Sequence, residues 1–443
     1  MAMAVDFALA GLLLLGAFAL RVRIKFFQWL FLPASIIAGF LGLLLGPNGC
    51  GWLPLSDGFD SYPGLLIALI YAALPFASDR ADFHALADHT RRLWSYSVFA
   101  VVTQWVIGLL LTLLVLRLFW PTLHAGFAAI LVSGFVGGHG TAAAVGAAFL
   151  ELGWKQAGTL AMTSATVGIL GSIIGGIVWI RWATRTGRTR FISRFDELPE
   201  ALRTGLLRPD QRSAAGEETV AANTLDPLMF QCAIVLLGFL CGFYLKGLWA
   251  AFFPTFVLPL FSLAFVAALM IRRLLQQTGL LPLVDRRTMR RISGSLTDLL
   301  IVFGIASIQF PVIVQYALPL AILFAAGFVL CGLVVRLFGP LFLGEKWFEG
   351  ALFTWGWITG VMAMGMALLR IVDSEHRGRV LDSFALAYLF VIPVEVGLIT
   401  FAPQLMSHGM SWLVFAATAL IAALLVGGAL WSRRNRRSQA AQE

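Results

Sequence analysis

The chain has 443 residues, of which 59% are hydrophobic and 12% charged, and its mean hydropathy is +0.87. Soluble domains carry about 45–50% apolar and about 25% charged residues, so this composition excludes a water-soluble globule. The net charge of +9 does not indicate nucleic-acid binding, because Lys and Arg lie between apolar stretches rather than along one polar segment. The four cysteines show no CxxC spacing, so neither a disulfide framework nor a zinc site is expected.

Apolar stretches of membrane-crossing length follow one another along the chain. A helix needs about 20 apolar residues to cross a hydrocarbon core of about 30 Å. The predicted spans are residues 2–20, 26–45, 63–77, 94–116 and 157–180, followed after a polar stretch by 228–245, 252–271, 296–310, 317–335, 383–402 and 412–431. These eleven spans predict an all-α polytopic membrane protein.

The first span is expected to be a retained helix rather than a signal peptide. The residues before its apolar run include Asp6 and no Lys or Arg, whereas Arg21, Arg23 and Lys25 follow the run. A signal peptide has the opposite charge order. The N-terminus is therefore expected outside.

Two Gly-rich segments interrupt the spans, and the two halves of the chain resemble each other at a shift of about 221 residues. Each half then has five crossings, an odd number, so the second copy must be inverted, as in many secondary transporters. The predicted parts are an N-terminal repeat 1–180 with a hairpin 122–151, a cytoplasmic linker 181–227, a C-terminal repeat 228–403 with a hairpin 347–369, and an extra helix with a basic tail 404–443.

The distribution of positive residues predicts the topology. If both Gly-rich segments are re-entrant hairpins, only Arg117, Lys155 and Lys246 of the 32 Lys and Arg residues lie outside. Cytoplasmic loops are enriched in Lys and Arg, so this arrangement is favoured over full crossings, and it places the C-terminus in the cytoplasm. The linker is expected to be flexible, with one amphipathic turn at 195–207.

The first Gly-rich segment contains the run Gly137-Gly138-His139-Gly140-Thr141. Non-helical backbone at membrane depth needs protein or water to satisfy its amides, so the glycines indicate a bend with exposed N–H groups. The returning arm would present the positive end of its helix dipole to an anion. The alternative is that the glycines only permit close helix packing. The place at the tip of a repeated hairpin favours an anion-binding site.

These motifs resemble the bacterial sodium/glutamate symporters. The resemblance rests on the run 137–141, on the stretch 162–176, on Phe253-Pro254-Thr255-Phe256-Val257 and on the Gly-rich segment of the second half. It covers nearly the whole chain except the eleventh span. It implies a homodimer of inverted repeats in the bacterial inner membrane, which carries L-glutamate with sodium by moving a core domain past a scaffold.

The second Gly-rich segment departs from this family's pattern. Where the family has a Thr-Pro-Thr-like stretch followed by Asn, this chain has Met362-Ala363-Met364 and Leu368. Sodium prefers hydroxyl and carbonyl oxygens to thioethers, so sodium and the proton both stay open as the coupling ion. The residues of this segment that are predicted to bind the small anionic substrate are Thr354, Gly356, Thr359 and Gly360.

Five residues are candidates for the coupling ion. Thr163, Ser164 and Thr166 could supply oxygens, although hydroxyls in membrane helices more often bond to a carbonyl of the preceding turn. Glu395 is the acidic residue deepest within a predicted span, and Asp298 lies near the start of the eighth. Ionisable groups inside a membrane are functional candidates by default.

Other charged or titratable groups allow two interpretations. His139 either donates to a carboxylate or carries a coupling proton, or it is a structural residue of the turn. Arg370 either meets a substrate carboxylate or serves as one more positive anchor. No HExxH or GxSxG motif supports an enzyme. A membrane sensor or assembly protein that has lost transport is the remaining alternative, because the second hairpin is altered.

Overall fold

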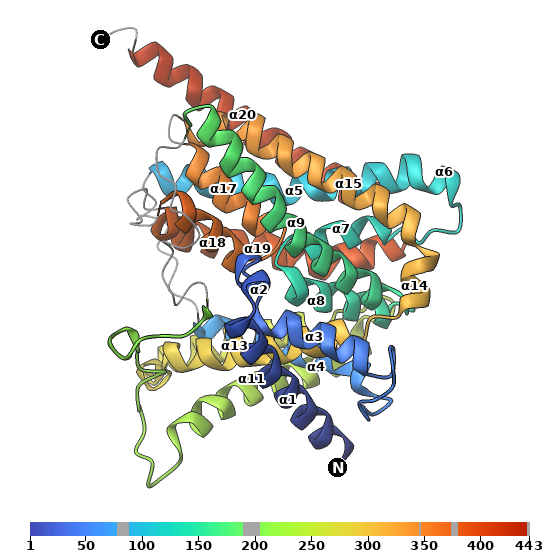
Figure 1. Ribbon diagram of the computed structural model, residues 1–443, viewed down its shortest axis with the longest axis vertical. Helices are drawn as coiled ribbons and strands as arrows, with labels where there is room; N and C mark the ends of the chain where they lie inside the picture. The colour runs from blue at the N-terminus through green and yellow to red at the C-terminus, as the bar shows by residue number, and fades with distance from the viewer. Residues whose placement is uncertain (78–87, 189–203, 345–346, 374–379, 441–443) are drawn as a thin grey trace. The chain divides into compact units, whose positions relative to one another are not determined.

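The structure is a computed structural model that describes residues 1–77, 88–188, 204–344, 347–373 and 380–440 (Figure 1). The described residues form helices and no strands, and nine of those helices are long and apolar enough to cross a membrane. An all-helical, multi-pass membrane protein is therefore confirmed. The predicted second and eighth spans are not among the nine, because one is short and the other is strongly charged.

Two compact units make up the chain, and each draws on both halves of the sequence. Unit 1 comprises Met1–Arg80, Ala142–Met162 and Pro199–Val312, and unit 2 comprises Ala81–Thr141, Thr163–Leu198 and Ile313–Glu443. The division therefore falls inside three helices, α8 (Gly138–Glu151), α9 (Ala157–Arg185) and α14 (Phe310–Gln315).

Close helix packing by small residues organises unit 1. Its helices are α1 (Ala2–Arg23), α2 (Lys25–Trp29), α3 (Ala34–Leu45), α4 (Tyr62–Ala77), α11 (Pro227–Phe252), α12 (Leu260–Gln277) and α13 (Arg286–Ala306). A Cβ on Gly39 of α3 would lie 2.8 Å from the Cβ of Ile305 on α13, and one on Gly242 of α11 would lie 2.5 Å from the Cα of Ala264 on α12. Without side chains at these positions, the backbones of α3 and α13, and of α11 and α12, approach closely.

The second and seventh predicted spans, both in unit 1, differ from the helices of the structure. The second span, 26–45, is broken, because α2 ends at Trp29 and α3 begins only after Pro33. Phe31 between them has a φ of +49°, in the left-handed region, and proline lacks the N–H that a continuous helix needs. The seventh span, predicted from 252, begins at Leu260 because α11 extends to Phe252.

The eighth span begins ten residues earlier than predicted, at Arg286 rather than at 296. Its first turns are amphipathic: Arg286, Arg287 and Arg290 are exposed, whereas Met289 is buried. A search for apolar runs cannot detect such a start, because it averages over both faces of the helix.

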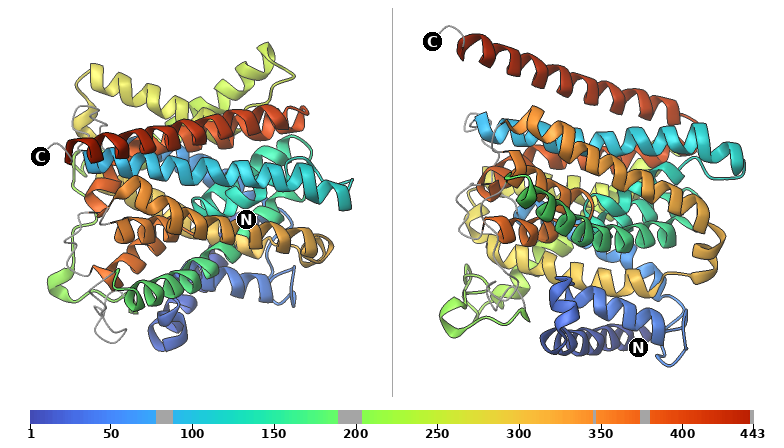
Figure 2. Two further views of the ribbon diagram at one scale, coloured as in Figure 1. Left: turned by 90° about the horizontal axis from the view of Figure 1, so that it is seen from above. Right: turned by 45° about the horizontal axis from the view of Figure 1, so that its top comes forward.

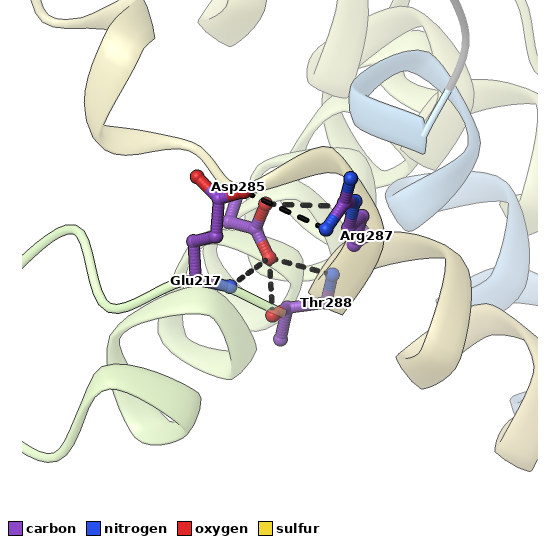
Figure 3. A network of polar contacts seen from close by, with 4 residues as sticks. All are labelled: Glu217, Asp285, Arg287 and Thr288. Carbon is purple, nitrogen blue, oxygen red and sulfur yellow. Dashed lines mark hydrogen bonds and ion pairs between the residues drawn. The ribbon is translucent and has the colours of Figure 1, made fainter. Parts of the chain in front are cut away.

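The end of the linker is anchored at the start of α13 (Figure 3). The Asp285 carboxylate accepts hydrogen bonds from the backbone N–H and the hydroxyl of Thr288, at 2.8 and 2.5 Å, and from the backbone N–H of Glu217, at 3.1 Å. Arg287 lies 3.6 Å from the Glu217 carboxylate. This part of the linker therefore differs from the flexible segment predicted for 181–227. Most of the turn predicted at 195–207 lies outside the described residues.

Replacing Asp285 by alanine is expected to lower the free energy of unfolding by about 1–2 kcal/mol, the cost of losing a helix N-cap. It should also speed trypsin cleavage after the exposed Arg212, because the linker loses its anchor. Asp226→Ala is the matched control, since Asp226 caps α11 through Leu228 and Met229. Equal cleavage rates in the two variants would contradict the anchoring role.

The same anchor should depend on pH. Burial alone would raise the pKa of Asp285, but the hydrogen bonds from Thr288, Glu217 and Arg287 hold that pKa below its ordinary value. Because the folded pKa is lowered, the stabilisation is complete above the unfolded pKa of about 3.9 and is lost as the pH falls through the folded value.

Unit 2 holds both Gly-rich segments and the C-terminal helix. Its helices are α5 (Asp88–Leu110), α6 (Arg117–Phe119), α7 (Phe127–Phe135), α15 (Ala317–Leu333), α16 (Gly339–Leu343), α17 (Trp347–Ile358), α18 (Met362–Val372), α19 (Val380–Ser407) and α20 (Ser411–Ala440), with the first turn of α8 and most of α9. A π-helical turn follows both α5, at Leu111–Leu116, and α15, at Val334–Phe338. Helices α5 and α20 run side by side in both views of Figure 2.

Candidate functional site

The first Gly-rich segment forms two helices, with a glycine turn between α7 and α8. Gly137 and Gly138 have φ values of +81° and +62°, which residues with a side chain rarely adopt. Helix α8 starts at Gly138, and helix geometry leaves its first N–H groups without an acceptor in their own helix. The turn therefore exposes the positive end of a helix dipole.

The second Gly-rich segment breaks in the same way between α17 and α18, at Thr359, Gly360 and Val361. Side chains satisfy the last carbonyls of α17. The amide of Gln104 on α5 donates to the carbonyl of Ile358 at 2.8 Å, and the hydroxyl of Ser172 on α9 donates to that of Gly356 at 3.1 Å. Helix geometry leaves the N–H groups of Met362 and Ala363 at the start of α18 without an acceptor in their own helix, whereas Met364 donates to the N-cap carbonyl of Val361 at 2.8 Å.

The two glycine turns lie against each other within unit 2. A Cβ on Gly138 would lie 3.3 Å from the carbonyl oxygen of Gly360 and would collide with Val361. Gly168 of α9 lies beside both segments, because a Cβ there would be 2.6 Å from the Thr359 oxygen and 3.5 Å from the Gly134 oxygen. The N-termini of α8 and α18 therefore approach one point beside the middle of α9, an arrangement that favours a carboxylate.

Two predicted side chains meet beside the first turn. His139 is 1% exposed, and its Nε2 lies 3.2 Å from the hydroxyl of Thr166 on α9. The His139 Nδ1 atom is buried without a hydrogen-bond partner in the described part of the chain. A Cβ on Gly137 would collide with the Thr141 hydroxyl, so Thr141 lies directly over the turn. Gly140 lies in the first turn of α8 between these residues.

Several other predicted hydroxyls are engaged with backbone carbonyls. Thr354 donates to Gly350 at 2.9 Å, Thr359 to Trp355 at 2.6 Å, and Ser164 to Leu131 at 3.4 Å. The first two are bonds to the preceding helical turn, the common role of hydroxyls in membrane helices. Thr163 neighbours Ser164 on α9. Gly356 lets the two arms of its hairpin touch, since a Cβ there would lie 2.5 Å from the Cα of Gly365.

The two predicted acidic residues belong to different units. Glu395 lies on α19 in unit 2, and Asp298 lies exposed on α13 in unit 1. The Tyr388 hydroxyl donates to Oε2 of Glu395 at 3.3 Å, while Oε1 is buried without a partner among the described residues. The Tyr388 ring packs edge-on against Trp357 of α17 at 5.8 Å, so Glu395 is linked to the second hairpin. The side chain of Arg370 lies outside the described residues.

Sequence reasoning missed Gln104 and Ser172, which hold the end of α17. Gln104 was detectable as a single amide inside the apolar span 94–116, because interhelical hydrogen bonds by such residues are common in membranes. Ser172 lies in a run of small residues and gave no separate signal. Among the described residues, no group of three His, Cys, Asp or Glu side chains could hold a metal ion.

Comparison with known proteins identifies a family for the chain. Residues 2–359 match the family described as sodium/glutamate symporter, and the match ends at Thr359, in the second glycine turn. No curated protein matches the chain significantly. Members of the family are cation-coupled glutamate transporters and not enzymes. Since the match covers most of its length, the chain belongs to the sodium/glutamate symporter family.

Proposed function

We propose that this protein carries L-glutamate with sodium, and that a substrate carboxylate binds where the N-termini of α8 and α18 approach each other. The observation that carries the proposal is the contact of Gly138 with Gly360 and Val361. Two helix N-termini at one point concentrate positive partial charge and N–H donors without a charged side chain. An anion gains most from such a site because water is largely excluded.

The residues around this point have separate roles in the proposal. The backbone of residues 137–141 and of Thr359 and Gly360 forms the binding surface, and His139 assists as a donor. Thr354 and Gly356 support the second hairpin from within, since their contacts are with its own backbone. The coupling ion takes oxygens from Thr163, Ser164, Thr166 or Glu395, which belong to unit 2; Asp298, in unit 1, is the remaining candidate.

We further propose an elevator mechanism with unit 2 as the moving core and unit 1 as the scaffold. Unit 2 contains both glycine turns and the helices α9 and α19, whereas unit 1 contains α1–α4 and α11–α13. Helices that are equivalent in the two halves thus belong to the same unit. One such pair is α5 and α15, which are each followed by a π-helical turn. The other is α9, which begins at Ala157 after the first hairpin, and α19, which begins at Val380 after the second. This pairing supports the repeats 1–180 and 228–403, joined by the linker 181–227.

The remaining parts of the proposal concern the membrane. Two repeats of five crossings would be inverted, with re-entrant hairpins at 122–151 and 347–369 and the extra helix in 404–443. The positive residues favour an N-terminus outside and a C-terminus in the cytoplasm. The family resemblance favours a homodimer in the bacterial inner membrane.

Uptake into sealed vesicles tests the function. With the purified chain reconstituted, an inward sodium gradient at equal pH on both sides is expected to drive accumulation of labelled L-glutamate above the equilibrium level. Empty vesicles are the control. Failure of both a sodium gradient and a pH gradient to drive uptake would favour the non-transporting sensor.

A proton-coupled carrier of a small carboxylate is the second candidate. It is favoured by one observation, the buried Oε1 atom of Glu395 that has no partner in the described part of the chain. Accumulation driven by a pH gradient in the absence of sodium would support it over sodium coupling.

A further inference from the structure

A cavity lined by arginine and tryptophan lies between α5, α16 and α20 in unit 2. Its volume is about 490 Å³. Among its lining residues are Arg91, Arg92 and Trp94 of α5, Phe342 of α16, and Leu424 and Trp431 of α20. All of these belong to unit 2, and none of the residues that line the cavity is acidic. The glycine turns do not contribute to it, so the cavity is separate from the proposed transport site.

The charged residues that line this cavity, and the two charged residues that follow its lining on α20, are arginines. Arg91 is exposed and Arg92 is half-buried, and the exposed Arg433 and Arg434 directly follow the lining residue Ser432 on α20. Under the proposed topology, this end of the helices faces the cytoplasm. The cytoplasmic leaflet is where anionic lipids attract basic segments, by about 1 kcal/mol per Lys or Arg near the surface.

One donor in the cavity wall is unsatisfied. The indole N–H of Trp94 is buried and has no hydrogen-bond partner among the described residues. Leaving a buried donor unpaired costs about 1–3 kcal/mol, so an acceptor at this position would be stabilising. A phosphate group is a suitable acceptor, because its oxygens accept hydrogen bonds from guanidinium groups as well as from an indole N–H.

Much of the rest of the cavity lining is apolar. Leu424, which is 66% exposed on α20, lines the cavity together with Leu425 and Phe342. Trp431, 69% exposed at the polar end, fits the interfacial position that tryptophan prefers in membrane proteins. A lining that combines arginines with apolar side chains matches a phospholipid better than a free anion.

We propose that this cavity binds an anionic phospholipid, with its phosphate beside Arg91, Arg92 and the Trp94 indole and an acyl chain along Leu424. The lipid would join α20 to α5. This gives a role to the eleventh predicted span, which has no counterpart in the first repeat. The site takes a structural lipid rather than the transported substrate.

Lipid titration of the purified full-length chain in neutral detergent tests the proposal. Phosphatidylglycerol is expected to raise the thermal midpoint saturably and to stay bound in native mass spectra, whereas phosphatidylcholine with the same acyl chains does neither. Arg91→Gln with Arg92→Gln should weaken apparent phosphatidylglycerol affinity at least tenfold. Trp94→Phe, which keeps an aromatic ring and removes only the N–H, should weaken it severalfold.

Arg273→Gln is the matched control, because Arg273 is an exposed arginine that lines a different, apolar groove between α11 and α12 in unit 1. It should leave phosphatidylglycerol binding unchanged. The proposal is overturned if Trp94→Phe and the double arginine variant bind phosphatidylglycerol like the unaltered chain. It is also overturned if inorganic phosphate stabilises the chain equally, which would show an anion site without lipid, or if the control loses as much affinity.

Discussion

Replacing Gly138 by valine is expected to abolish glutamate binding while leaving the chain folded. The φ of +62° at this position is strained for a β-branched residue, by about 1–3 kcal/mol. More importantly, the new side chain would occupy the space between the two glycine turns, where a Cβ alone already collides with Val361. The N-termini of α8 and α18 would be pushed apart, and a carboxylate could no longer contact both.

Ligand-induced thermal stabilisation measures this effect. Glutamate at about 100 times its dissociation constant should stabilise the unaltered chain by about 2.7 kcal/mol, and this gain should vanish in Gly138→Val. The measurement needs sodium present throughout, because the coupling ion and the substrate are expected to bind together. Gly138→Ala, which adds only a Cβ, should keep a reduced response.

Gly153→Val is the control that distinguishes loss of the binding site from backbone strain at a glycine with positive φ. Gly153 has a φ of +90° and no atom within 4 Å of the Cβ position, so valine there is strained without meeting a neighbour. This variant should lose stability but keep its response to glutamate. A Gly138→Val variant that responds to glutamate like the unaltered chain would mean that the glycines serve packing only, as the alternative interpretation of the sequence holds.

The glycine turns were predictable because their signal is local. Two consecutive glycines such as Gly137 and Gly138 destabilise a continuous helix, so they indicate a break. Inside a membrane, the N–H groups that such a break exposes need a partner, and the break therefore indicates a functional turn. The contact of Gly138 with Gly360 was not predictable, because it joins residues far apart in the chain. Neither the periodicity nor the composition of the sequence indicates that the two turns contact each other.

Hydropathy could not predict where the amphipathic helix α13 begins or where the second span is broken. The first turns of α13 alternate exposed arginines with the buried Met289, so their mean hydropathy resembles that of a loop. The break at Phe31 lies inside an apolar run, and the nearby Pro33 is a sequence signal for it that hydropathy averaging does not register.

Removing the charge of Glu395 is expected to weaken coupling to sodium. Sodium is a hard cation that favours charged and neutral oxygens, and Oε1 of Glu395 is a buried oxygen without a partner among the described residues. Glu395→Gln keeps an oxygen and the side-chain shape but removes the charge. The sodium concentration for half-maximal glutamate uptake should rise at least tenfold, with exchange at saturating sodium retained.

The effect should reach the substrate through the second hairpin. Tyr388 contacts both the Glu395 carboxylate and the ring of Trp357, and Trp357 directly precedes Ile358, the last residue of α17. A change at Glu395 can therefore alter the position of the turn at Thr359 and Gly360. Tyr388→Phe, which removes the hydroxyl and keeps the ring contact, should shift the sodium dependence in the same direction and by less.

Asp298→Asn makes the same change of charge on α13 in unit 1 and is the control; it should leave the sodium dependence unaltered. Proton coupling predicts a different pattern, because glutamine cannot take up a proton at all. A pH gradient alone would then drive uptake in the unaltered chain, and Glu395→Gln would only exchange substrate. If sodium-driven uptake has the same sodium dependence in Glu395→Gln as in the unaltered chain, Glu395 is a structural residue of α19 and the coupling ion takes its oxygens elsewhere.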